Sequence, residues 1–273
     1  GSDDLNFGTT LTVTGGDATF DLGDTTANSL TVTGATDIDG ALIVTGGDAT
    51  EDINFAAIDV LDAAEFNLGA ADNTLDATGV ATFQDTLTYT GLGDGDSVDF
   101  AAGLAVTTDA VINLGAGTNN FNVAGGLTDI DSTLTVNSGA GDDTVGFEAI
   151  DVVGAAAFNL GAGTNTLDAS GAATFNDTFT YTGLGGDDAV TFGDTFTVAS
   201  DAVFNLGDAA GVENDVTVTG ATDIDGQLQI TGGANTDDIN FAAIDVAQAA
   251  VVDLGAGTNT LDATAAANFQ DTF

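Results

Sequence analysis

The chain has 273 residues, a formal net charge of −43 and no lysine, arginine or histidine, and it also lacks cysteine and proline. Without basic side chains it has no group that attracts phosphate or nucleic acid, and without histidine, cysteine or lysine it lacks the common catalytic bases and nucleophiles. We therefore expect no enzymatic activity, no binding to nucleic acid and no insertion into a membrane.

Short segments of alternating apolar and polar residues follow one another from the N-terminus to the C-terminus. An apolar residue that opens a strand recurs every 22 to 26 residues, at Leu5, Leu30, Ile53, Leu75, Val98, Phe121, Val145, Leu167, Val190, Val216, Ile239 and Leu261. A unit of about 23 residues is too small to bury its own apolar face, so it must stack on its neighbours. The pattern predicts an all-β fold, a parallel β-solenoid (β-helix) of about twelve rungs.

A longer repeat of four rungs, about 93 residues, is superimposed on the rungs. The phrase Leu75-Asp76-Ala77-Thr78 returns with one change at 167–170 and unchanged at 261–264. We therefore expect a single domain over residues 1–273. Its super-repeats are approximately 5–97, 98–189 and 190–273.

The residue two positions after each strand start is expected to point into the core, because alternate residues of a strand share one face. This column reads Phe7, Val32, Phe55, Ala77, Phe100, Val123, Phe147, Ala169, Phe192, Val218, Phe241 and Ala263. Rungs stack about 4.8 Å apart, so a phenylalanine on every rung would overfill the core. The cycle of Phe, Val, Phe and Ala explains why the long repeat spans four rungs.

The residue two positions before each strand start alternates between an acid and an amide. The column reads Asp3, Asn28, Glu51, Asn73, Asp96, Asn119, Asp143, Asn165, Asp188, Asn214, Asp237 and Asn259. One explanation is that a neutral Asn between stacked acids doubles the distance between like charges. Another is that acid, amide and glycine carbonyl oxygens form sites for a hard cation. The two explanations are compatible.

The glycine- and aspartate-rich turns at 139–145 and 161–167 resemble the nonapeptide of hemolysin-type (RTX) calcium-binding β-rolls, although here the motif comes once per rung rather than in tandem. The resemblance implies calcium as the cofactor, held by acids of the column and by the acids beside them. These candidate ligands are Asp3, Glu51, Asp96, Asp143, Asp188 and Asp237, together with Asp142, Asp187 and Asp238. Ordinary turns without metal remain the alternative, since Gly, Asn and Asp are common turn residues.

A second candidate cation site is a pair of acids two residues apart on one strand, which places both carboxyl groups on the same outer face. Such pairs are Asp37 with Asp39 and Asp223 with Asp225. The alternative is that these acids form a solvated face.

Threonine pairs such as Thr88 with Thr90 and Thr180 with Thr182 resemble the Thr-x-Thr ladders of ice-binding β-solenoids. The rungs between them carry Asn instead, as at Asn113 and Asn159, so the ladder is interrupted. Ice binding is therefore kept as an alternative function.

The two ends of the chain match each other in register. Phe273 aligns with Leu87 of the first super-repeat and residues 1–4 align with 94–97, so only Thr88 to Gly93 separate the end of one copy from the start of the next. We expect neither end to be capped, and uncapped strand edges promote association. The expected partner is the chain itself, in a head-to-tail homopolymer.

The chain as a whole resembles bacterial secreted β-solenoid repeat proteins of the adhesin and surface-filament type. The expected function is that of an extracellular structural protein, the subunit of a calcium-stabilised surface filament. The alternative is a segment of a longer calcium-dependent adhesin, stalk or surface-layer protein. Secretion to the cell surface is the expected localisation.

Overall fold

The computed structural model describes residues 3–24, 26–207, 213–234 and 236–272. All regular secondary structure in these ranges is β-strand, arranged in one sheet of 18 strands, called sheet A, and one sheet of 11 strands, called sheet B. Paired strands run parallel. The all-β parallel β-solenoid predicted from the sequence is confirmed.

Sheet A contains the two segments that begin each rung. Its strands are β1 (Asp4–Phe7), β2 (Leu11–Val13), β4 (Asn28–Ile38), β6 (Glu51–Val60), β8 (Thr74–Ala77), β9 (Ala81–Phe83), β11 (Ser97–Phe100), β12 (Leu104–Val106), β14 (Asn120–Ile130), β16 (Thr144–Val152), β18 (Thr166–Ala169), β19 (Ala173–Phe175), β21 (Ala189–Phe192), β22 (Phe196–Val198), β24 (Glu213–Ile224), β26 (Thr236–Val246), β28 (Thr260–Ala263) and β29 (Ala267–Phe269).

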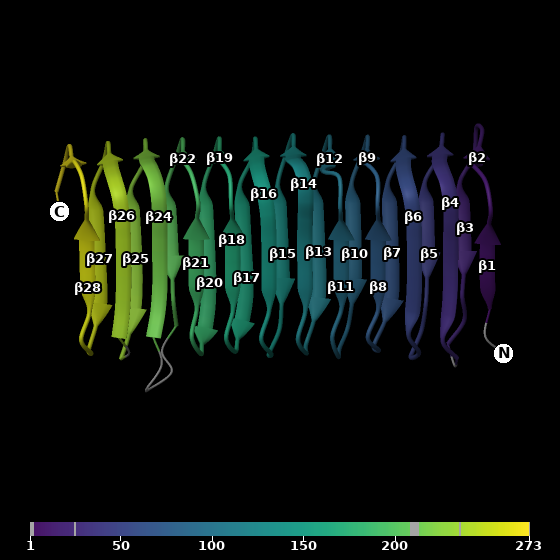
Figure 1. Ribbon diagram of the computed structural model, residues 1–273, viewed down its shortest axis with the longest axis horizontal. Coiled ribbons are helices and arrows are strands. Elements are labelled where there is room, and N and C mark those ends of the chain that lie inside the picture. The colour runs from purple at the N-terminus through teal and green to yellow at the C-terminus, as the bar shows by residue number, and fades with distance from the viewer. Residues whose placement is uncertain (1–2, 25, 208–212, 235, 273) are drawn as a thin grey trace.

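Sheet B contributes one strand to each rung. Its strands are β3 (Ala18–Asp21), β5 (Leu42–Thr45), β7 (Ala64–Gly69), β10 (Leu87–Gly91), β13 (Ala110–Gly115), β15 (Leu134–Ser138), β17 (Ala156–Ala162), β20 (Phe179–Gly185), β23 (Ala202–Asn205), β25 (Leu228–Gly233) and β27 (Ala250–Gly255). Figure 1 shows that the strands of the two sheets point in opposite directions and that the chain ends lie at opposite ends of the rod. The described strands give about eleven complete turns, close to the twelve rungs predicted.

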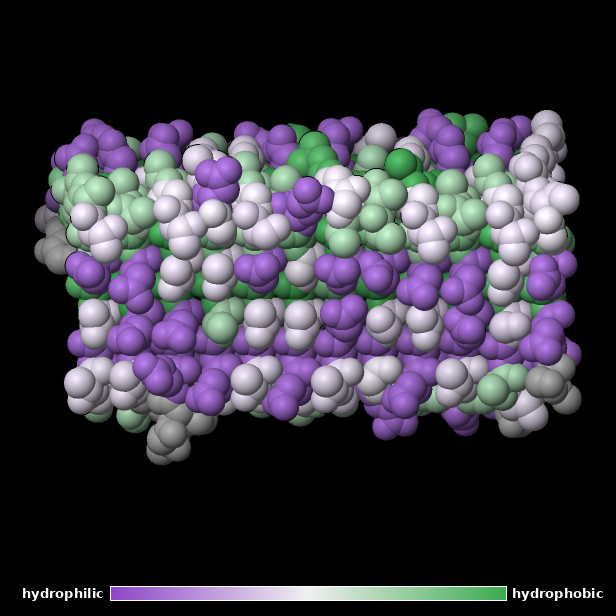
Figure 2. Space-filling model, in the orientation of Figure 1, coloured by the Kyte–Doolittle hydropathy of each residue, from purple (hydrophilic) through white to green (hydrophobic). Residues whose placement is uncertain are grey.

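The predicted inward column is confirmed strand by strand. Phe7 pairs with Val32, Val32 with Phe55 and Phe55 with Ala77, and the same register continues to Ala263. These side chains are buried except in the two end rungs. Stacking equivalent positions also aligns the outer side chains, and Figure 2 shows them as rows along the rod in which hydrophilic residues are interspersed with residues of intermediate hydropathy.

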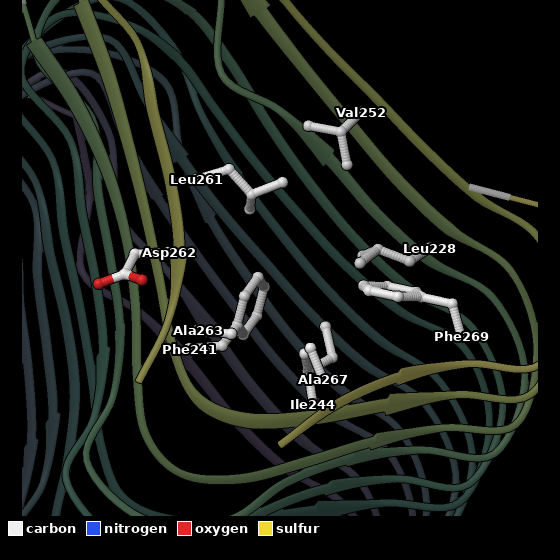
Figure 3. Close-up of a pocket in the computed structure, with 9 residues that line it drawn as sticks. All are labelled: Leu228, Phe241, Ile244, Val252, Leu261, Asp262, Ala263, Ala267 and Phe269. Carbon is white, nitrogen blue, oxygen red and sulfur yellow. The ribbon is translucent and has the colours of Figure 1, made fainter. Parts of the chain in front are cut away.

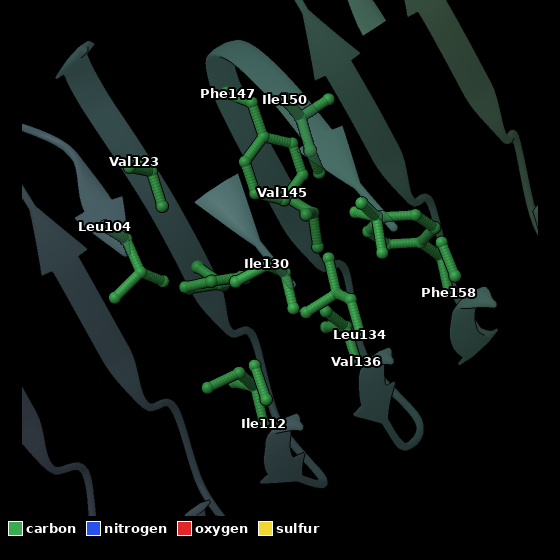
Figure 4. Close-up of a cluster of buried hydrophobic side chains, with 14 of the residues drawn as sticks. Leu104, Ile112, Val123, Ile130, Leu134, Val136, Val145, Phe147, Ile150 and Phe158 are labelled. Atoms are coloured by element: carbon green, nitrogen blue, oxygen red, sulfur yellow. The ribbon is translucent and has the colours of Figure 1, made fainter. Parts of the chain in front are cut away.

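The core is filled by side chains that lean between the sheets. Phe147 of sheet A meets Phe158 of sheet B edge-on, with ring centroids 6.0 Å apart, and Figure 4 shows both among Ile130, Leu134 and Val136. In the sheet A column each phenylalanine has Val or Ala on the neighbouring rungs, so its ring can extend beyond its own rung. This arrangement allows close packing without strain.

The four-rung period is also visible in the backbone. Two successive rungs of each cycle have one continuous sheet A strand, as in β4 and β6, whereas the next two have separate short strands, as in β8 with β9 and β11 with β12. The same order recurs with β14 and β16 and with β24 and β26. In the part of the chain described here, no helix is long and apolar enough to span a membrane.

Candidate functional sites

The alternating acid and amide column lies inside the coil, at the point where the chain turns from sheet B into sheet A. We call its buried members the interior ladder: Asn28, Glu51, Asn73, Asp96, Asn119, Asp143, Asn165, Asp188, Asn214 and Asp237, each exposed by 4% or less. At the ends of the rod, Asp3 is exposed and Asn259 is half-buried. Carboxyl groups are rarely buried without a cationic partner, and this chain has no basic side chain.

Hydrogen bonds connect each rung of the interior ladder to the next. The backbone N–H of Asn73 and its side-chain Nδ2 both donate to Asp96 Oδ1, at 3.0 and 3.2 Å. The backbone N–H of Asp96 in turn donates to Asn119 Oδ1 at 2.9 Å. Asn119 repeats the double donation to Asp143 at 3.0 and 2.8 Å. An ionised carboxyl group only accepts hydrogen bonds, so every second position needs the amide as a donor.

The second oxygen of each interior acid has no hydrogen-bond partner among the described residues. These atoms are Glu51 Oε2, Asp96 Oδ2, Asp143 Oδ2, Asp188 Oδ2 and Asp237 Oδ2. Asp96 Oδ2 lies so close to Gly91 that a Cβ there would be 1.5 Å from it, and the corresponding distance between Gly183 and Asp188 is 1.7 Å. A side chain at either glycine would therefore force the carboxyl group or the backbone to move.

The residue five positions before the ladder residue differs between the acid rungs and most amide rungs; Asn28 and Asn214, which have Gly23 and Ala209 there, are the exceptions. Acid rungs carry Gly46, Gly91, Ser138, Gly183 and Gly232, whereas the amides Asn73, Asn119, Asn165 and Asn259 are preceded by Leu68, Leu114, Leu160 and Leu254. Sequence reasoning missed this coupling, although the alternation of Gly and Leu was a usable signal. The coupling identifies two kinds of rung with different space beside the ladder.

Burial changes the acid–base properties of the interior acids. Desolvation raises the pKa of Asp96 to about 7, while hydrogen bonds from Asn73 and a contact with the Tyr89 hydroxyl act in the opposite direction. Desolvation likewise raises the pKa of Asp188 to about 7, beside Asn165 and Tyr181. Burial also raises the pKa of Glu51 and Asp143. Near neutral pH a substantial fraction of Asp96 and Asp188 is therefore protonated.

The same hydroxyl groups have raised pKa values of their own. Desolvation raises the pKa of Tyr89 and Tyr181 far above the usual range, and the neighbouring carboxyl groups Asp96 and Asp188 add to the effect. Both phenols are therefore neutral throughout the physiological range. Neither hydroxyl oxygen has a partner with good hydrogen-bond geometry, so each is a polar group held beside a carboxyl group in the core.

The predicted calcium ligands of the column are not brought together. An amide separates each interior acid from the next, and the free oxygen of Asp96 and of Asp188 faces a glycine rather than other oxygen atoms. Calcium needs six to eight oxygen ligands. Calcium binding by these residues stays a prediction. An ion placed at any one interior acid would find few oxygen ligands around it.

The neighbouring turn acids lie on the outside. Asp142 is exposed and accepts the backbone N–H of Thr164 at 2.8 Å, while Asp187 accepts that of Glu213 at 2.7 Å. Asp238 belongs to the one group of three carboxyl groups within 4.8 Å of one another in the described residues, with Glu213 and Asp215. Desolvation raises the pKa of Asp215, and the charges of Asp238 and Asp187 add to it.

The outer aspartates pair between rungs rather than along one strand. Asp37 lies in register with Asp59 of the next rung, and Asp223 with Asp245. Asp129 and Asp151 form the corresponding pair of the second super-repeat, which the sequence analysis did not single out. We call these three the outer carboxylate pairs. Amide side chains donate hydrogen bonds to these aspartates; for example, Asn176 Nδ2 donates to Asp151 Oδ1 at 2.8 Å.

The other members of the predicted outer sites lie at the strand ends. Asp39 follows β4 and accepts the backbone N–H of Gly15 at 3.1 Å. Asp225 occupies the corresponding position after β24. Neither belongs to a group of three acids close enough to share an ion in the described residues.

Among the described residues, the first and last rungs have core side chains that are covered on one side only. At the C-terminal end a cavity of about 270 Å³ is lined by apolar residues, and Figure 3 shows Leu261, Phe241 and Phe269 around it. Leu261 is 42% exposed. At the N-terminal end Leu5 and Phe7 are only half-buried. The predicted register between the ends includes residues 1, 2 and 273, which lie outside the described residues.

Comparisons with known proteins identify no relative. No protein-family model matches the sequence, no curated protein matches it, and no solved structure matches it.

Proposed function

We propose that this protein is an extracellular structural rod that extends end to end by stacking further copies in the same register. The observation that carries the proposal is the sequence and exposure of strand β28. A rod of this kind has no single active site, and its repeated rungs serve as spacers and as assembly surfaces.

Two internal copies of β28 indicate which strand would cover it. Strand β8 has the same sequence, Thr-Leu-Asp-Ala, and pairs with β11 so that Ala77 meets Phe100. Strand β18 also has this sequence and pairs with β21, so that Ala169 meets Phe192. In the described residues β28 pairs with β26 and has no strand on its other side. The strand needed there carries an apolar residue followed two positions later by Phe.

Strand β1 has this pattern, with Leu5 and Phe7 at the required positions. Placed on β28, it would set Phe7 against Ala263 as in the interior. The ladder would continue as well, because Asn259 would precede Asp3 as Asn165 precedes Asp188. Adding a strand to an open edge supplies backbone hydrogen bonds and buries the apolar end.

The alternative is that the rod is one segment of a longer adhesin, stalk or surface-layer protein. In that case the same end surfaces would be covered by further rungs of the same chain. The extracellular setting is proposed from the composition, since calcium is plentiful outside cells and could bridge the outer carboxylate pairs and the group at Glu213, Asp215 and Asp238.

Two variants that each block one end test the end-to-end proposal. Leu261→Asp places a charge in the C-terminal cavity, and Phe7→Asp does so at the N-terminal rung. We expect the unmodified chain to form fibres of uniform width in electron micrographs. Each variant alone should remain a single rod, and an equimolar mixture should form dimers of doubled length.

The matched control is Val251→Asp, which adds the same charge to the exposed outer face of the last sheet B strand, where its register neighbour is the neutral Gln229. It should still form fibres. Appending a copy of residues 88–93 to the C-terminus should strengthen the association, since this segment supplies the sheet B strand of the last rung. Single rods of one length for the unmodified and the extended chain would contradict end-to-end growth.

Calcium is tested separately by circular dichroism at low salt. Chelator should weaken the β-sheet signal and millimolar calcium should restore it, because divalent ions would offset the repulsion of the outer pairs. Equal stability with chelator and with calcium would remove calcium from the proposal and leave the rod function intact.

A further inference from the structure

Acidic residues are distributed unevenly between the outer faces of the two sheets. On sheet A, the outward column through β4, β6, β14, β16, β24 and β26 contains Asp37, Asp59, Asp129, Asp151, Asp223 and Asp245. On sheet B, the outward positions of six successive strands, from β10 to β23, contain no acid at all. We call this the neutral face: Thr88, Thr90, Val111, Asn113, Thr135, Asn137, Ala157, Asn159, Thr180, Thr182, Val203 and Asn205.

The neutral face is regular and firmly held. One of its two columns alternates threonine with an apolar residue, from Thr88 and Val111 to Thr180 and Val203. The other is mainly asparagine, and Asn159 donates to Asn137 at 2.9 Å as Asn137 donates to Asn113 at 2.7 Å. All twelve side chains are half-buried. Hydrogen-bonded amide columns and alternating sizes favour a tight contact between two sheets.

Charge determines which surface of another molecule could pack here. A second copy of this chain carries the same net charge of −43, so most contacts between two copies would bring carboxylates together. A contact between two neutral faces would bury no carboxylate of either face, and face-to-face sheets pack about 10 Å apart. Asp109 and Asp201, in the turns that lead into β13 and β23, stay at its rim.

We propose that the neutral face is a lateral interface between two copies of this chain, with sheet B of one rod packed on sheet B of the other. The interface lies along the side of the rod and does not depend on end-to-end growth. The rim acids of the two copies repel each other, so the contact forms only at salt concentrations that screen this repulsion. The Debye length falls from about 10 Å at 0.1 M salt to about 3 Å at 1 M.

The test measures the mass and width of the rods as the salt concentration rises. It uses the Leu261→Asp background, in which end-to-end growth is blocked, so that a doubled mass reports lateral pairing alone. Sedimentation at 10 mM to 1 M NaCl should show the mass doubling at high salt. Electron microscopy should show rods of doubled width and unchanged length.

Two double variants with equal added charge locate the interface. Thr135→Asp with Thr180→Asp places two acids on the neutral face, two rungs apart. Thr144→Asp with Ala189→Asp does the same on the outer face of sheet A. We expect the first pair to weaken dimer formation at least tenfold and the second pair to leave it unchanged, with circular dichroism confirming that both fold.

Several results would overturn the proposal. A monomer at every salt concentration would do so, as would equal loss of dimer in both double variants. Ice shaping or thermal hysteresis by a monomer, lost in the neutral-face variant alone, would assign this face to ice instead. Rods of doubled length and single width in the Leu261→Asp background would show that the chains associate at their ends and not along their sides. The same result would show that Leu261→Asp does not block end-to-end growth.

Discussion

For the interior acids, the protonation state of the carboxyl group decides how well the side chain fits the core. Asp96 Oδ1 accepts two N–H groups from Asn73, but its Oδ2 is buried without a partner, beside Gly91 and the hydroxyl of Tyr89. As a carboxylate, Asp96 leaves a charged oxygen buried in a chain that has no basic side chain to pair with it. As a carboxylic acid it is neutral and gains a donor, which suits the core far better.

We predict that the protein is more stable at pH 4 than at pH 8. Burial raises the pKa of Asp96 and Asp188 from 3.8 to about 7 in the folded state. The folded protein then binds more protons than the unfolded chain, so their contribution is fully present below pH 3.8 and is lost as the pH rises to about 7. A shift of this size corresponds to roughly 4 kcal/mol for each group. Urea unfolding across this range measures it.

Asp96→Asn provides the check on this assignment, because the amide keeps Oδ1 and cannot titrate. The variant should be less sensitive to pH than the unmodified protein and more stable at pH 8. Asp168→Asn, which removes one charge from the outer face of β18, should leave the pH dependence nearly unchanged. Equal pH dependence in the unmodified protein and Asp96→Asn would show that general charge repulsion, not the interior acid, is responsible.

A single glycine controls the same site from the neighbouring strand. Gly91→Ala places a methyl group 1.5 Å from Asp96 Oδ2, so the carboxyl group or the backbone must move. Overpacking of a well-packed core typically costs about 1–3 kcal/mol, and we expect a loss at the upper end because the displaced group is polar. Gly93→Ala, where the nearest atom is 3.6 Å from the new carbon, should be nearly neutral. Similar melting temperatures for the two variants would contradict this account.

At the scale of one element, the interior ladder works as a unit because donors and acceptors alternate. Asn119 accepts the backbone N–H of Asp96 through Oδ1 and donates through Nδ2 to the carboxyl group of Asp143 on the other side. Asn119 Nδ2 also reaches the carbonyl oxygen of Gly117 at 3.3 Å, which ties the ladder to its turn. Charges on alternate rungs are about 9.6 Å apart, twice the strand spacing.

We predict that Asn119→Asp is strongly destabilising at pH 8. The change removes the donor to Asp143 Oδ1 and puts carboxyl groups on three successive buried rungs. An uncompensated buried charge costs about 3–5 kcal/mol. The control is Asn122→Asp on the outer face of β14, where the amide donates to Asp99 at 3.1 Å and solvent screens the new charge. The control should lose about 1 kcal/mol or less. Chemical unfolding at pH 8 compares the two, and equal losses would remove the ladder argument.

At the scale of the whole molecule, repulsion between carboxylates on neighbouring rungs recurs along the rod because the rungs repeat. Equivalent positions of successive rungs lie in register, so acids that recur at one outward position face each other between rungs. An outer pair such as Asp37 and Asp59 brings two carboxylates to neighbouring strands. At the strand spacing of about 4.8 Å, each such pair costs roughly 0.9 kcal/mol even at the dielectric constant of water.

We predict that the melting temperature at pH 8 rises with ionic strength, because salt screens these rows. Asp59→Asn removes one outer pair and should reduce the salt dependence measurably. Asp168→Asn, whose register neighbours are Gly146 and Thr191, should reduce it less. Thermal unfolding between 10 mM and 1 M NaCl provides the measurement. A melting temperature that does not change with salt would mean that repulsion between rows is unimportant.

The sequence by itself determined the strand spacing, the four-rung period and the inward column from Phe7 to Ala263. These features follow from alternation along a strand and from the stacking of equal units, both of which can be counted in the chain. The alternation of acid and amide was also visible. The location of these residues inside the coil could not be predicted. Asp96 and Asn119 come before their strands, and there the conformation of the turn decides whether a side chain points inward.

Only the tertiary structure decided which groups meet. Gly91 and Tyr89 approach Asp96 from the strand of sheet B that ends just before it, and Asp59 joins Asp37 from the next rung. The neutral face likewise consists of residues about 23 positions apart in the sequence, which form one surface only because the register of sheet B places them side by side. Pattern within a strand fixes which way a residue points, whereas its environment depends on the register between rungs and on the geometry of the turns.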